Sequence, residues 1–159
     1  MAENPYAGDL ADREPIAALG EAASIIEALT SAFDAAAWQR RYAPGKWTSR
    51  EILVPLAQIE MVFGMRVRYA LSTGDYVVQV FDQDPFMAVE AAAIDAATAR
   101  AAFLSVRAMN LQLFRSLTTE QRQTRFMHPE RGEMTVIELI AYLAGHDWRH
   151  IGQLKSIAS

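Results

Sequence analysis

Four stretches of the chain repeat apolar residues at intervals of three and four positions, which places those residues on one face of an α-helix. The first helix is expected to begin near Glu14-Pro15, because proline fits a first helical turn, and to end before Pro44-Gly45, a helix-breaking pair. Its apolar stripe consists of Ile16, Leu19, Ala23, Ile26, Phe33 and Ala37. The second helix is expected to follow Thr48, which has the spacing of a capping box with Glu51, and to end near Ser72-Thr73-Gly74.

Two further helices follow two linkers, residues 75–86 and 118–134. The third helix is expected from about Met87 to Leu117 and is rich in alanine. The fourth begins at Thr135, which forms a second capping-box pattern with Glu138. Within the linkers, residues 76–81 resemble a strand in composition but have no evident partner, so we expect extended packing there. Residues 82–85 have the composition of a turn, and residues 118–120 of a short helical turn.

These patterns predict an all-α protein, a four-helix bundle formed by one domain over residues 1–159, with residues 1–13 as an extended N-terminal arm. The linker 75–86, about 12 residues long, spans roughly 40 Å when extended. The second helix, about 24 residues long, measures roughly 36 Å. The linker is therefore long enough to cross back along the bundle, which leaves a parallel arrangement of the second and third helices open.

Composition narrows the function classes. The chain is 52% apolar and 21% charged, with a net charge of −4, and the absence of cysteine excludes disulfides, thiolate metal sites and a cysteine nucleophile. No cluster of lysine and arginine indicates a nucleic-acid partner. No apolar run approaches the roughly 20 residues that span a bilayer, and the N-terminus lacks the layout of a signal peptide, so no membrane partner and a cytoplasmic location are expected.

The candidate chemistry lies in the fourth helix, where His146 and His150 stand four residues apart. That spacing places both imidazoles on one helical face, where neutral ring nitrogens can bind a metal. Two other interpretations remain open: a favourable position near the helix C-terminus, and simple hydrogen bonding of buried histidines to a carbonyl or carboxylate. Two histidines at this spacing do not by themselves define a metal site.

Several sequence segments, in their order and spacing, carry a resemblance to a known family. The segments are Pro44-Gly45-Lys46-Trp47-Thr48-Ser49-Arg50-Glu51, Leu56-Ala57-Gln58-Ile59-Glu60, Arg66-Val67-Arg68, His128-Pro129, Gly132-Glu133-Met134-Thr135 and His146-Asp147-Trp148-Arg149-His150-Ile151-Gly152-Gln153. Together they resemble the DinB/YfiT-like superfamily of metalloenzymes from about residue 10 to the end of the chain.

The resemblance implies a four-helix bundle with parallel second and third helices, often assembled as a homodimer. It also implies a divalent metal, commonly nickel or zinc, held by one histidine of the second helix and two of the fourth. The fourth-helix pair corresponds to His146 and His150, whereas Pro55 occupies the position of the second-helix ligand. Characterised relatives include thiol-dependent transferases and isomerases that use small thiol cofactors.

Pro55 removes the usual third ligand, because proline has no side chain that coordinates a metal, and in a helix interior it is expected to cause a kink. Glu51, one turn earlier, is a substitute ligand candidate, although we favour its role in the capping box. Gln58, Tyr142 and Gln153 are candidates for the lining of a pocket. Arg66 is expected either to form an ion pair or to hold an anionic substrate.

The remaining polar residues of these segments are expected to be structural. Glu60 points away from position 55, and His128 is expected to be exposed in a loop. Asp147 is interpreted as a structural acid. Trp148 and Arg149 are expected to face another helix or a dimer partner.

Two functions are therefore weighed. The first is a divalent-metal-dependent enzyme, such as a thiol-dependent transferase, with an incomplete three-histidine site. The alternative is a metal-free member of the family that acts as a small-ligand-binding or protein-interaction module. The sequence leaves open whether the protein is an enzyme.

Overall fold

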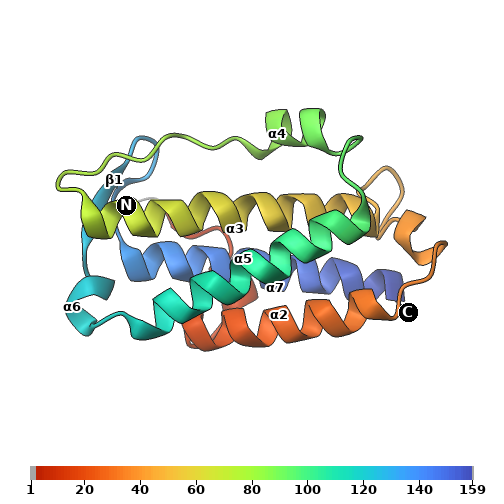
Figure 1. Ribbon diagram of the computed structural model, residues 1–159, viewed down its shortest axis with the longest axis horizontal. Coiled ribbons are helices and arrows are strands. Elements are labelled where there is room, and N and C mark those ends of the chain that lie inside the picture. Colours follow the sequence, from red (N-terminus) through yellow and green to blue (C-terminus); the bar gives the residue numbers. More distant parts are fainter. Residues whose placement is uncertain (1–2, 159) are drawn as a thin grey trace.

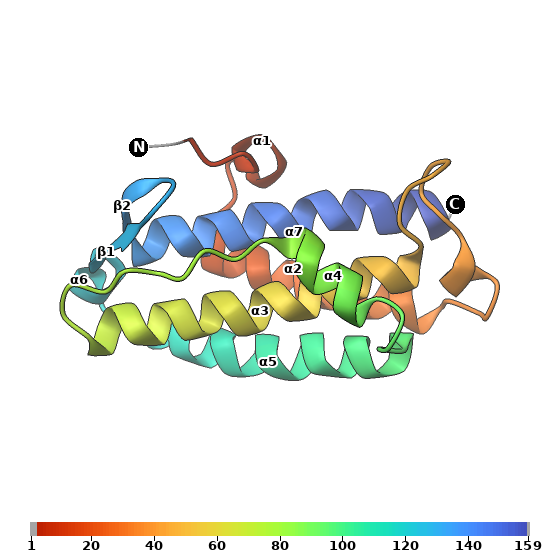
Figure 2. The same ribbon diagram turned by 90° about the horizontal axis from the view of Figure 1, so that it is seen from above.

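The computed structural model describes residues 3–158, so residues 1 and 2 of the predicted arm, and Ser159, lie outside the described part. Four long helices lie side by side: α2 (Pro15–Ser31), α3 (Ser49–Ser72), α5 (Ala96–Ser116) and α7 (Val136–Ala158) (Figures 1 and 2). Helix α3 packs against α5 and α7, and α2 packs against α7. The predicted four-helix bundle is confirmed. Among the described residues, no helix has the length and apolar character needed to cross a bilayer.

The course of the chain between α3 and α5 is visible in Figure 1. Helices α3 and α5 run in the same direction, and the segment between them returns along the length of the bundle. This segment contains the short helix α4 (Gln83–Glu90). In Figure 2 it lies over one side of α3, so it covers part of the surface that a simple four-helix bundle would leave open.

Helix ends follow the predicted capping chemistry in two places. The Thr48 hydroxyl accepts a hydrogen bond from the Glu51 backbone N–H, and the Glu51 carboxylate accepts one from the Thr48 N–H, so this capping box is confirmed. Thr135 and Glu138 form the same pair of bonds at the start of α7. Helix α3 continues through Pro55 as one element.

Two predicted helix boundaries are wrong. The first helix ends at Ser31, and a short 3₁₀-helix, η1 (Ala37–Gln39), follows Asp34, whose carboxylate accepts a hydrogen bond from the Ala37 N–H. The third helix is two helices, because the Asp95 carboxylate accepts a hydrogen bond from the Thr98 N–H at 2.7 Å and begins a new helix there. A short acceptor side chain in an extended conformation is a strong helix start.

A small antiparallel hairpin closes one end of the bundle, and the sequence patterns did not predict it. Strand β1 (Arg125–His128) pairs with β2 (Gly132–Thr135), after the short helix α6 (Thr119–Arg122) in the region where a helical turn was expected. The expectation that residues 76–81 lack a partner is also wrong. The Val78 N–H donates to the Met127 carbonyl, and the Met127 N–H donates to the Tyr76 carbonyl.

The N-terminal arm is not fully extended, because it contains one helical turn, α1 (Ala7–Leu10), that packs on α7. The close approach requires a glycine: a Cβ on Gly145 would lie 2.4 Å from the Tyr6 carbonyl oxygen. Arg149 pairs with Asp9 at 2.9 Å. The arm therefore covers the face of α7 next to the two histidines.

A buried ionic cluster joins all four long helices. The Arg107 guanidinium of α5 donates to the Glu60 carboxylate of α3 and to the Asp147 carboxylate of α7, both at 2.5 Å, and to the Leu19 carbonyl of α2 at 2.9 Å. Glu60 and Asp147 are fully buried, and Arg107 is 1% exposed. Asn110 completes the cluster by donating to Glu60. Asp147 is a structural acid, as interpreted from the sequence, and Glu60 belongs to the same cluster.

Replacing Arg107 with methionine is expected to destabilise the protein by about 3–5 kcal/mol, because two buried carboxylates lose their cation. The measurement is the free energy of unfolding in urea at neutral pH. Arg115→Met, on the exposed side of the same helix, is the matched control and should change stability by no more than about 0.5 kcal/mol. Equal effects of the two substitutions would contradict the structural role assigned to the cluster.

Candidate functional site

The two histidines of α7 meet inside the protein. His146 is 2% exposed and His150 is 4% exposed, and their Nε2 atoms lie 3.1 Å apart. The Tyr6 ring meets the His146 ring edge-on at 5.3 Å between centroids. The Trp47 ring lies nearly parallel to the His150 ring at 6.2 Å. The N-terminal arm and the start of α3 therefore enclose the pair.

Burial lowers the pKa of both histidines to about 3, so both are neutral at physiological pH. His150 Nδ1 lies 2.7 Å from Gln153 Oε1, so Nδ1 carries the proton and donates, and the His150 Nε2 lone pair is free to accept. His146 Nε2 is then the donor to that lone pair. His146 Nδ1 and Asp147 Oδ1 lie 3.9 Å apart, and neither has a hydrogen-bond partner in the part of the chain that the structure describes.

The separation of the histidines suits a metal, but the set of ligands is incomplete. Two nitrogens bound at about 2.0–2.1 Å to a tetrahedral zinc lie roughly 3.3 Å apart, close to the distance between the two Nε2 atoms. Zinc sites nevertheless take at least three protein ligands. Among residues 3–158, no group of three histidine, cysteine, aspartate or glutamate side chains is placed to hold a metal ion. The residues present therefore do not fit a complete three-ligand site.

Glu51, the substitute ligand considered from the sequence, is engaged elsewhere. Its carboxylate accepts from the Thr48 N–H at 2.8 Å and lies 3.3 Å from the Arg41 guanidinium. The backbone hydrogen bond from Thr48 lowers the pKa of Glu51, as expected for a carboxylate at a helix N-terminus. A metal would have to displace these interactions to recruit Glu51.

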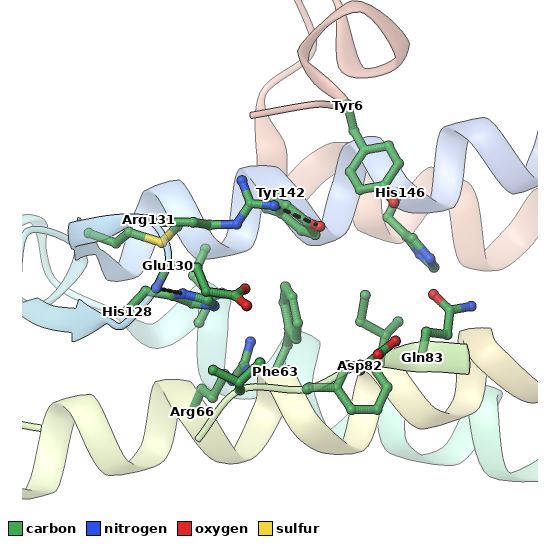
Figure 3. Close-up of a pocket in the computed structure, with 15 residues that line it drawn as sticks. Tyr6, Phe63, Arg66, Asp82, Gln83, His128, Glu130, Arg131, Tyr142 and His146 are labelled. Carbon is green, nitrogen blue, oxygen red and sulfur yellow. Dashed lines mark hydrogen bonds between the residues drawn. The ribbon is translucent and has the colours of Figure 1, made fainter. Parts of the chain in front are cut away.

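A cleft with a volume of about 330 Å³ extends from His146 towards the hairpin (Figure 3). It is bounded by α3, α7, the hairpin turn and the segment that leads into α4. The lining residues are Tyr6, Ile59, Phe63, Arg66, Val80, Phe81, Asp82, Gln83, His128, Glu130, Arg131, Met134, Leu139, Tyr142 and His146. The cleft thus combines an apolar floor with several polar side chains, which is typical of a small-molecule site.

Only one of the three pocket candidates named from the sequence lines this cleft. Tyr142 does, and Figure 3 shows its ring beside Arg131. Gln58 is buried outside it and donates to Glu90 of α4 at 2.9 Å. Gln153 is also outside it and binds His150 instead.

The prediction that His128 is exposed is wrong. It is 7% exposed and lines the cleft, because β1 alternates buried and exposed residues and His128 falls on the buried side. Its Nδ1 accepts a hydrogen bond from the Glu130 N–H at 3.2 Å. The sequence showed only a Pro-Gly loop here; the alternation of Phe126 and His128 was the available signal.

Arg107 was also missed, although a signal existed. It lies on the buried face of α5 between Phe103 and Leu111, each four residues away. A charged residue within an apolar stripe of this kind requires buried partners.

Comparisons with known proteins place this geometry in context. A sequence profile of the DinB superfamily matches residues 18–154. A protein of Oceanobacillus iheyensis named as a putative metal-dependent hydrolase is 25% identical over 116 residues, covering 73% of this chain and 67% of that protein.

Two solved structures share the fold. YfiT from Bacillus subtilis, described as a probable metal-dependent hydrolase with an unusual four-helix bundle topology, has a TM-score of 0.80 at 19% identity, covering 90% of this chain and 83% of that one. The mycothiol-dependent maleylpyruvate isomerase has a TM-score of 0.72 at 14% identity. That match covers 97% of this chain but 63% of the isomerase, so this chain spans less than two thirds of its length.

The buried histidine pair predicts that the protein is destabilised by acid. The pKa of each histidine is about 3 in the folded state and 6.5 without burial, so the unfolded state binds more protons between these values. Stability should fall as the pH drops below 6.5, by about 2 kcal/mol per histidine between pH 7 and pH 5. Urea unfolding of the wild type and of the His146→Gln/His150→Gln double variant at both pH values measures this. An equally steep pH dependence in the double variant would refute the assignment.

Proposed function

Because the chain belongs to the DinB superfamily, we propose that it is a small-molecule-binding member of that superfamily whose three-histidine metal centre is reduced to His146 and His150. The observation that carries the proposal is Pro55, a residue without ligand capacity, at the position where the resemblance implies the third ligand. The cleft next to His146 is the binding site in this proposal.

The surroundings of Pro55 support its position opposite the histidine pair. Trp47, just before α3, contacts the His150 ring, and Ile59, one turn after Pro55, lines the cleft together with His146. Pro55 is buried and lies between these two residues in the sequence. A histidine side chain at position 55 would therefore originate from the part of α3 that lies opposite His146 and His150.

The cleft supports a small-molecule ligand rather than a protein partner. Its volume of about 330 Å³ falls at the lower end of ligand-binding sites, and its polar side chains converge on an apolar floor formed by Ile59 and Phe63. A site of this size accommodates a compact molecule.

Pro55→His is expected to raise the affinity for zinc or nickel by at least tenfold, which corresponds to about 1.4 kcal/mol, because it supplies a third imidazole. Isothermal titration calorimetry of untagged, metal-free protein measures the effect. The substitution also restores an N–H to the helix interior, so unfolding is measured in parallel to separate folding from binding. Wild-type protein that binds the metal as tightly as the variant would refute the loss of the site.

Glu51→Gln is the matched control for the same titration. Glutamine keeps the hydrogen bond to the Thr48 N–H but lacks the charge that makes glutamate a good ligand. We expect unchanged metal affinity. A tenfold loss would show that Glu51 leaves the cap to complete a metal site.

A metal-dependent enzyme is the second candidate function. The specific observation in its favour is the 3.1 Å separation of the two Nε2 atoms, with Gln153 hydrogen-bonded to His150 Nδ1 at 2.7 Å. Hydrogen bonds of this kind orient metal-binding imidazoles. The names of the Oceanobacillus and Bacillus relatives, and the mycothiol dependence of the isomerase, favour metal-dependent hydrolysis or thiol chemistry.

Metal analysis of protein purified without a histidine tag and without chelator tests this second function. About one equivalent of zinc, nickel, iron or manganese per chain, lost in the His146→Ala variant, would favour it over the first. The melting temperature is also measured with the metal alone and with the metal plus cysteine or glutathione. A larger rise with the thiol present would identify a thiol substrate. No bound metal and no thermal shift would remove the candidate.

A further inference from the structure

Arg66 is a buried cation on the wall of the cleft with no carboxylate beside it. Arg66 is only 5% exposed, and its one hydrogen bond to the described residues runs from Nη2 to the Gln79 carbonyl at 2.6 Å. Within residues 3–158, no aspartate or glutamate oxygen lies within 4.0 Å of its guanidinium. Burial lowers the pKa of Arg66, which reflects the cost of holding this charge away from water. Buried charges in proteins are normally paired.

The two acids that line the cleft lie at its solvent-exposed rim. Asp82 is exposed, and its carboxylate accepts from the Asp84 N–H at the start of α4. Glu130 is exposed and, in the described part of the chain, forms no ion pair within 4.0 Å. The charge of Glu130 raises the pKa of Arg66 less than burial lowers it, and water screens both exposed acids, so neither offsets the buried guanidinium as a direct partner would.

His128 approaches the same part of the cleft from the hairpin, opposite Arg66 on α3 (Figure 3). Because its Nδ1 accepts from the Glu130 N–H, a neutral His128 carries its proton on Nε2, which is a further donor. Burial and the nearby charges of Arg66 and Arg131 lower the pKa of His128, and the charge of Glu130 acts in the opposite direction. Two arginines against one glutamate leave a net positive charge around His128 at this end of the cleft.

The other end of the cleft leads to His146, where Figure 3 also places Gln83, and the floor between the two ends is apolar. Ile59, Phe63 and Arg66 follow at steps of four and three along α3, so they lie on one face. The seven steps from Ile59 to Arg66 correspond to about 10 Å along the helix. Leu139 and Tyr142 of α7 form the opposite wall. A ligand held at Arg66 would lie on Phe63 and reach towards His146.

We propose that the cleft binds a small organic carboxylate, with its carboxylate held by Arg66 and the His128 Nε2–H and its apolar body lying on Phe63 and Ile59. This inference rests on the proposed small-molecule function and adds the chemical class of the ligand. The guanidinium fork matches the two oxygens of a carboxylate. With Nη2 already bound to Gln79, one guanidinium edge remains, which suits a carboxylate better than a phosphoryl group with three terminal oxygens.

The test is the binding of matched probes to the full chain, measured by isothermal titration calorimetry at low salt. The probes are straight-chain carboxylates of four to eight carbons, alcohols of the same lengths, and hexyl phosphate. We expect at least one carboxylate to bind at least tenfold more tightly than the alcohol of equal length. This comparison uses only the wild-type protein, so it does not depend on the folding of any variant.

Variants assign the preference to Arg66. Arg66→Gln should weaken carboxylate binding at least tenfold and leave alcohol binding unchanged, whereas Arg66→Lys should retain part of the preference because it keeps the charge. Arg125→Gln is the control. It removes an exposed arginine from the hairpin that carries His128, and it should leave the affinities for carboxylates and alcohols unchanged. Melting temperatures of all three variants verify that they are folded.

The outcomes separate this inference from the function on which it rests. Equal binding of alcohols and carboxylates would overturn the carboxylate site but keep the small-molecule cleft. Tighter binding of hexyl phosphate than of every carboxylate would replace the ligand class with a phosphate. Carboxylate selectivity that survives Arg66→Gln in a folded variant would refute the role of Arg66. No binding of any probe would overturn both proposals.

Discussion

The ion cluster of Arg107 with Glu60 and Asp147 is the constraint on which the rest of the structure depends. It contacts each of the four long helices and lies away from water, so the helices must hold one relative position for its hydrogen bonds to form. Burial alone would lower the pKa of Arg107. The two carboxylates have the larger effect, so the pKa of Arg107 is raised. Burial raises the pKa of both carboxylates, since one guanidinium cannot fully compensate two anions. Such a cluster favours a unique arrangement more than it favours stability.

The same cluster sets the orientation of the histidines. Successive residues of a helix point about 100° apart, so once Asp147 points to Arg107, His146 must point elsewhere. It faces the arm and the cleft, and His150, one turn later, meets it. Gly145, next to His146, has no side chain, and this lets the N-terminal arm pack directly against α7. The packing that buries Asp147 therefore also fixes the positions of His146 and His150.

The sequence predicted the elements whose signals are local and missed those that depend on contacts between distant segments. Apolar periodicity and capping boxes located α3 and α7. Both signals relate residues only three or four positions apart, so they can be read from the sequence alone. The break before α5 was missed because the flanking alanines favour a helix and only Asp95 marks the new start. The bridge between Val77 and Met127 joins segments about 50 residues apart, which no local pattern reveals. Only the structure shows that His128 is buried and that no acid among the described residues forms an ion pair with Arg66.

The two ends of the cleft make opposite electrostatic demands on a ligand. At one end the cleft meets His146, which is neutral, hydrogen-bonded to the neutral His150 behind it and in contact with the Tyr6 ring, so this end tolerates an uncharged group. At the other end the largely buried Arg66 presents its positive charge to the cleft, and no carboxylate of residues 3–158 lies within 4.0 Å of it. Keeping that charge buried costs folding free energy, and an anion that binds there recovers part of the cost. Under the proposal that Pro55 stands in place of a second-helix ligand, the first end is a weak metal site and the second end is unaffected. Recognition at Arg66 can therefore persist in this chain whether or not a metal ever binds the histidines.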